Sequence, residues 1–177
     1  MGVRRVELEI KTADQLVDPS LEARGAARRE ARLTDVLQAV LRAFRNWAGP
    51  VPLEEITATL PGCTPAVVQD TLVALDKEDL IQLREGRVAI AYPFSAIPTA
   101  FTVGFADGAE RYACCAVDAL GMAPMLGEPV HIRSQCHDCQ ARLALEVGPD
   151  GVDPGSEEVM VWVGNRSDEP SRITTSL

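Results

Sequence analysis

The chain has 177 residues, a hydrophobic fraction of 46% and a formal net charge of -9. This length allows one generous domain or two small ones that share a core, and the composition is that of a globular protein rather than a disordered chain. The acidic excess lies mostly at the end, because residues 106–177 carry five basic and twelve acidic side chains. Nucleic acid and anionic membranes are therefore poor partners for this surface.

The N-terminal segment MGVRRVELEI alternates charged and apolar residues, and no run of eighteen apolar residues occurs anywhere. We therefore expect neither a signal peptide nor a membrane span, and we expect a cytoplasmic protein. Four of the five cysteines lie between Cys114 and Cys139. A disulfide framework is not expected in a reducing compartment, and an odd number of cysteines cannot pair completely, so the clustering indicates thiol or metal chemistry.

Residues 1–32 show only weak secondary-structure patterns and are predicted to form an N-terminal arm. The pattern sharpens over residues 33–44, where apolar side chains recur with the period of an amphipathic helix. A second, shorter helix is expected after Pro52. A third is predicted to begin with Thr64 as N-cap and Pro65 at the first helical position.

A small hairpin should follow, with strands at 81–83 and 88–92 around the turn Glu85-Gly86. Three helices and a hairpin predict a winged-helix-like domain over residues 33–92, and such domains often bind DNA through the third helix. Here the residues 64–80 that contain that helix offer one basic side chain, Lys77, against four acidic ones: Asp70, Asp76, Glu78 and Asp79. We therefore expect packing or partner contact rather than DNA binding.

After a linker at 93–99 the hydrophobic period changes to two, which predicts a small mixed β-sheet with one short helix over residues 100–177. The predicted fold class is thus α+β. Strands are expected near 101–105, 130–132, 141–147 and 159–163. The helix, starting at Cys115, is expected to be interrupted at Gly121 and Pro124 and closed at Gly127.

The segment YACCAVDAL, residues 112–120, places two cysteines and a carboxylate within five positions. In a helix, Cys115 and Asp118 stand at i and i+3 and share a face, whereas Cys114 is turned away by about 100°. The helix dipole at an N-terminus is expected to lower the pKa of the Cys115 thiol toward neutrality. The alternative is that both cysteines are small buried hydrophobes and Asp118 is an ordinary surface charge.

The motif CHDC, residues 136–139, is expected at the turn between two strands and has the spacing of half a zinc ribbon. A closed zinc site needs four ligands, and no second CxxC exists, so completion would require Cys114, Cys115, His131 or His137. The alternative is that Cys136 and Cys139 are reduced thiols that pack or lie at the surface.

Three segments carry a family resemblance: AYPFSAIPTAFTV (91–103), YACCAVDALGMAPMLG (112–127) and VHIRSQC (130–136). They resemble the organomercurial (alkylmercury) lyase family. The resemblance implies that the Cys115 thiolate takes mercury and that Asp118 protonates the departing carbon, without an organic cofactor. It also implies small organomercurial substrates, small thiols as co-reactants, and a mercuric reductase that accepts Hg(II) downstream.

The family has a further mercury-binding cysteine after a segment that resembles residues 172–177, and the present sequence stops at Leu177 without it. Slow lyase turnover is therefore expected unless Cys114, Cys136 or Cys139 substitutes.

Two other functions compete with the lyase. One is a non-catalytic soft-metal binding or sensing protein that holds Hg(II), Zn(II) or copper through Cys115, Cys136 and Cys139. The other is an interaction module with incidental cysteines.

Overall fold

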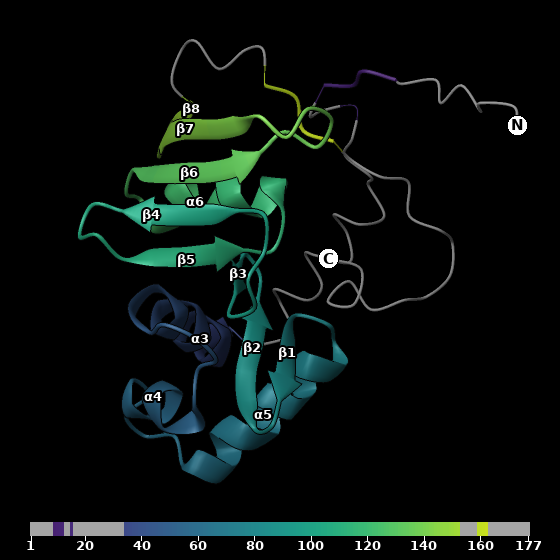
Figure 1. Cartoon of the computed structure of the whole chain (residues 1–177). Coiled ribbons are helices and arrows are strands. Elements are labelled where there is room, and N and C mark those ends of the chain that lie inside the picture. Colours follow the sequence, from purple (N-terminus) through teal and green to yellow (C-terminus); the bar gives the residue numbers. More distant parts are fainter. Residues whose placement is uncertain (1–8, 13–14, 16–33, 153–158, 163–177) are drawn as a thin grey trace, which may run out of the picture. The chain divides into compact units, whose positions relative to one another are not determined.

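A computed structural model describes residues 9–12, 15, 34–152 and 159–162 (Figure 1). The described residues 35–152 and 159–162 belong to one compact unit. Most of the predicted N-terminal arm, and the segment 163–177, lie outside the described residues. Within the described segments, none of the helices has the length and hydropathy that crossing a bilayer requires.

The described elements are helices followed by strands, with one helix inserted among the strands. In chain order they are α3 (Thr34–Asn46), α4 (Leu53–Ala58), α5 (Pro65–Lys77), β1 (Ile81–Arg84), β2 (Arg87–Ala91), β3 (Phe94–Ser95), β4 (Thr102–Phe105), β5 (Glu110–Ala113), α6 (Ala116–Leu126), β6 (Val130–Gln135), β7 (Arg142–Gly148) and β8 (Gly151–Val152).

All eight strands belong to one sheet with the order β1-β2-β3-β5-β4-β6-β7-β8. The predicted α+β class is confirmed, but every pairing is antiparallel, so the sheet is not mixed. The sheet also extends into the expected linker, where Ser95 of β3 pairs with Ile90 on one side and Tyr112 on the other. A strand of two residues has no detectable hydrophobic period, which is why the sequence did not indicate this connection.

The three predicted helices before the hairpin are present. The Thr64 hydroxyl accepts a hydrogen bond from the Val67 amide at 3.4 Å, and Pro65 opens α5, as expected. Val36, Val40 and Phe44 of α3 are buried, and Phe44 stacks on Phe94 of β3 with ring centroids 5.8 Å apart. The core therefore joins α3 to the middle of the sheet.

Helix α6 covers one face of the sheet (Figure 1) and contacts β5, β6, β7 and β8. The predicted interruption at Gly121 and Pro124 is wrong, because the helix runs on to Leu126 and ends at Gly127, which adopts a left-handed φ of 70°. Burial of three side chains against the sheet outweighs the low helix propensity of glycine and the hydrogen bond that proline removes. These side chains are Ala119, Met122 and Ala123.

The prediction of a strand at 159–163 is also wrong for the residues that the structure describes. Residues 159–162 have no regular structure, and Met160 and Trp162 are 63% and 62% exposed. Apolar and β-branched residues favour a strand only where a neighbouring strand edge is available for pairing. Within the described residues, β8 already occupies the edge of β7, so residues 159–162 do not pair with β7.

Two arginines connect the C-terminal end of α3 to the sheet. Arg111 of β5 donates from Nε to the Phe44 carbonyl at 2.7 Å and from Nη2 to the Arg45 carbonyl at 2.9 Å. Arg45 pairs with Glu128 at 2.7 Å and with Asp107 at 3.1 Å, and its guanidinium lies 4.0 Å from the Phe105 ring centroid. Arg111 thus supplies donors to helix carbonyls at the negative end of the dipole.

We predict that Arg111→Gln lowers the free energy of unfolding by about 2–4 kcal/mol, because two charge-assisted hydrogen bonds to the end of α3 are lost. Arg133→Gln is the matched control, since within the described residues Arg133 forms an exposed pair with Glu110, and such pairs contribute about 0–1 kcal/mol. Urea denaturation followed by circular dichroism measures both. Equal losses in the two variants would contradict the proposed role of Arg111.

Candidate functional site

The sheet fixes the point at which the chain enters α6. The Ala113 amide donates to the Phe101 carbonyl at 3.0 Å, and the Cys114 amide donates to the Pro93 carbonyl at 3.0 Å. The Thr99 hydroxyl donates to the Ala113 carbonyl at 2.6 Å. Thr99 is a positioning residue that the sequence did not indicate, because it lies in a segment interpreted as a linker. Together these bonds hold the last residues of β5, so the next residue has a defined place.

That next residue, Cys115, is the N-cap of α6 and has extended backbone angles. Its Sγ donates to Oδ2 of Asp118 at 3.0 Å, and the Asp118 amide donates back to Sγ at 3.4 Å. The contact predicted from the i, i+3 spacing is therefore present. A thiol in place of the usual hydroxyl or carboxylate caps this helix.

Burial raises the pKa of both Cys115 and Asp118. It raises the pKa of the Cys115 thiol, and the hydrogen bond to the Asp118 carboxylate raises it further, against the lowering effect of the Asp118 amide. The expectation of a pKa lowered toward neutrality is therefore wrong, because burial and a neighbouring anion outweigh the helix dipole. Burial also raises the pKa of Asp118, although the hydrogen bonds from Cys115 oppose that shift. In this arrangement the Cys115 thiol is the donor and the Asp118 carboxylate is the acceptor.

Cys114 points into the protein interior. Its thiol is buried and lies 3.3 Å from the Phe94 carbonyl, to which it donates. Burial raises the pKa of Cys114 strongly, with smaller contributions from Asp118 and Cys115. Because the thiolate is the form that binds soft metals, Cys114 is poorly suited to serve as a second ligand beside Cys115.

The CHDC motif occupies the turn between β6 and β7, as predicted. Cys136 is half-buried and Cys139 is exposed. Backbone amides of Cys139 and Asp138 and the thiol of Cys139 donate to the Cys136 sulfur and lower its pKa. Among the residues that the structure describes, no group of three or more His, Cys, Asp or Glu side chains could hold a metal ion. The structure therefore does not gather Cys136 and Cys139 with Cys115 into one metal site.

The two remaining candidate ligands, His131 and His137, each have a contact of their own. His131 contacts Glu146 across β6 and β7, with Nδ1 and Oε1 2.6 Å apart. His137 stacks with Trp162, ring centroids 6.5 Å apart. The fifth cysteine, Cys63, is exposed just before α5.

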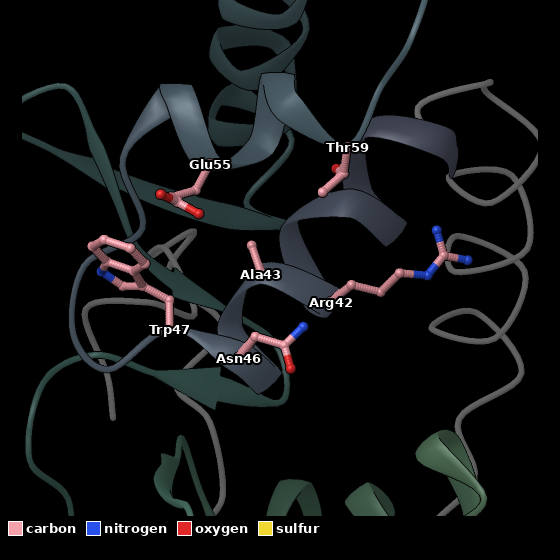
Figure 2. A pocket seen from close by; sticks show the side chains of 6 residues that line it. All are labelled: Arg42, Ala43, Asn46, Trp47, Glu55 and Thr59. Carbon is pink, nitrogen blue, oxygen red and sulfur yellow. The ribbon is translucent and has the colours of Figure 1, made fainter.

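An open pocket of about 150 Å³ lies between α3 and α4 (Figure 2). Its lining contains none of the residues singled out in the sequence, and it offers neither a thiol nor a histidine. The lining residues are Arg42, Ala43, Asn46, Trp47, Glu55 and Thr59. This pocket gives no indication of the chemistry of the Cys115 and Asp118 pair.

The chain is similar in sequence to known alkylmercury lyases. The family model for alkylmercury lyase (MerB) matches residues 94–176. The alkylmercury lyase of Staphylococcus epidermidis is 31% identical over 115 residues, which cover 63% of this chain and 51% of that protein. The enzyme of Bacillus cereus is 33% identical over 132 residues, which cover 72% of this chain and 56% of that protein. The chain thus spans about half the length of the curated relatives it matches.

A solved structure, the mercury-bound form of MerB2, has the same fold with a TM-score of 0.60 at 19% sequence identity. The similarity covers 77% of this chain and 66% of that one. Taken with the curated relatives and the family match, these findings confirm the resemblance seen in the sequence. Residues 94–176, which include Cys115, Asp118 and the CHDC turn, are thus similar in sequence to the alkylmercury lyase family.

Proposed function

We propose that the chain cleaves the carbon–mercury bond of small organomercurials by protonolysis, with Cys115 as mercury acceptor and Asp118 as proton carrier. The observation that carries the proposal is the 3.0 Å contact between the Cys115 thiol and the Asp118 carboxylate. It lies within the segment that matches the alkylmercury lyase family. A soft nucleophile and a carboxyl group in direct contact are the two groups that this reaction requires.

The reaction divides into two proton transfers. Mercury of R–Hg⁺ bonds to the Cys115 sulfur while the thiol proton moves to the Asp118 carboxylate. The Asp118 carboxyl group then gives this proton to the carbon, which keeps the electron pair of the breaking carbon–mercury bond and leaves as RH. Hg(II) remains on the sulfur. Burial, which raises both pKa values, keeps the proton within the pair until mercury replaces it.

A second thiolate would raise the electron density on mercury and make the carbon easier to protonate. Cys114 is a poor source, because its thiol is buried and donates to the Phe94 carbonyl. Small thiols from solution are the proposed source, and they also carry Hg(II) away to a mercuric reductase. The metal-binding or sensing alternative, in which Cys115, Cys136 and Cys139 together hold one ion, receives less support, because the described residues include no group of three such ligands.

We further propose that α3, α4, α5 and the β1–β2 hairpin form the winged-helix-like part, residues 33–92, next to a lyase-like part, residues 100–177. The Asp76 carboxylate supports a packing role, since it accepts a hydrogen bond from the Leu83 amide at 2.9 Å and so joins α5 to the hairpin. The acidic side chains of α5 remain unfavourable for binding DNA.

We predict that Cys115→Ser abolishes both mercury binding at this site and product formation, because a hydroxyl is too hard a ligand for mercury. Asp118→Ala should leave mercury binding nearly intact and slow product formation by about 10²- to 10⁴-fold, the usual contribution of a positioned proton donor. The assay measures release of methane or benzene from methylmercury or phenylmercury with a small thiol in excess.

The control for these variants is Cys63→Ser, which removes an exposed cysteine outside the proposed site and should retain full activity. Unchanged activity in Cys115→Ser would remove the catalytic assignment. An inactive unmodified chain that still binds Hg(II) would favour the metal-binding function.

A separate prediction concerns the acid–base coupling of the pair. The Asp118 carboxylate raises the pKa of Cys115 by accepting its thiol proton and by its charge, so Asp118→Asn should lower that pKa. The pH at which Cys115 is half-reactive toward iodoacetamide, followed by peptide mass spectrometry, should therefore move down. A midpoint that stays in place or moves up would show that the carboxylate does not hold the thiol proton.

A further inference from the structure

We infer that the CHDC turn is a second mercury site, separate from Cys115, in which Cys136 and Cys139 together hold inorganic Hg(II) as a two-thiolate chelate. The inference goes beyond the proposed lyase function and does not depend on it. It concerns the ion itself rather than the carbon–mercury bond, and it uses neither Cys115 nor Asp118.

The turn holds the two cysteines at close range. The Cys136 amide donates to the Ala141 carbonyl at 2.8 Å, and the Gln140 amide donates to the Cys136 carbonyl at 3.0 Å. Gln140 has a left-handed φ of 60°, and its side-chain amide donates to the His137 carbonyl at 3.0 Å. The strands β6 and β7 pair up to Gln135 and Arg142, directly beside the turn. The backbone of the motif is therefore fixed from both ends.

Both cysteines belong to this one turn, and their thiols are accessible. The hydrogen bond from the Gln140 amide to the Cys136 carbonyl closes a turn that contains Cys136 and Cys139, so their side chains leave the backbone from the same turn. Cys139 is exposed and Cys136 is half-buried, and neither forms a disulfide. A soft cation can thus reach Cys139 first and then bond to Cys136 with little movement of the backbone.

The number of ligands favours mercury over zinc. Zinc requires four ligands in a closed site, whereas no third His, Cys, Asp or Glu joins this pair among the described residues. Hg(II) is a soft ion that forms stable complexes with two thiolates. Binding releases the two thiol protons and adds two positive charges, so the net charge of the turn does not change. Binding therefore does not increase the electrostatic repulsion within this acidic segment of the chain.

The test uses the double variant Cys115→Ser/Cys63→Ser, so that failure of the lyase proposal and failure of this one remain distinct. The protein is exposed to Hg(II), dialysed against excess 2-mercaptoethanol, and examined for retained mercury by elemental analysis and native mass spectrometry. We expect one Hg(II) per chain. Because a second thiol in the same turn raises the effective concentration, adding Cys139→Ser should weaken retention by about 10²- to 10⁴-fold.

Cys136→Ser should have the same effect, whereas Asp138→Asn, a change in the same turn that leaves both thiols, should not. Cys139 is exposed, so its replacement is expected to preserve the fold, which circular dichroism checks. Trp162 stacks on His137 within the motif, and its fluorescence should be quenched by bound Hg(II) only when both cysteines are present. Loss of all Hg(II) from the double variant, or retention that survives Cys139→Ser, would overturn the inference.

Discussion

The hydrogen bonds at the end of β5 are the constraint on which the candidate site depends. The amides of Ala113 and Cys114 donate hydrogen bonds to the carbonyls of Phe101 and Pro93. The Thr99 hydroxyl donates to the Ala113 carbonyl, so the chain leaves the sheet at one defined point. Cys115 then caps α6, and the first turn of that helix brings Asp118 back to the thiol. The geometry of the Cys115 and Asp118 pair therefore depends on the pairing of strands that precede it in the sequence.

The chemistry of the pair arises from opposing influences on its protons. Cys115 lies at a helix N-terminus, which favours a thiolate, but burial and the Asp118 carboxylate favour the thiol. Burial likewise favours the protonated form of Asp118. A pair of this kind can pass one proton between sulfur and carboxylate when a soft cation binds. An exposed thiolate would have no proton left to give to carbon.

The sequence predicted features that depend on local chemistry and missed those that depend on distant partners. The cap at Thr64 and the contact between Cys115 and Asp118 follow from spacing within one turn of helix, and both are present. The continuation of α6 through Pro124 depends on burial against the sheet, and the bridging strand at Ser95 depends on two neighbouring strands. Neither leaves a periodic signal in the chain.

We propose that Cys115 accepts the organomercurial and that Asp118 supplies the proton that breaks the carbon–mercury bond. A single-turnover experiment tests it most directly: phenylmercury is loaded onto the chain without free thiol, the adduct is located by peptide mass spectrometry, and benzene is followed after addition of thiol. We expect an adduct on Cys115 in both the unmodified chain and Asp118→Asn, with benzene released about 10²- to 10⁴-fold more slowly by the variant. Benzene release at equal rates, or the absence of an adduct on Cys115, would contradict the proposal.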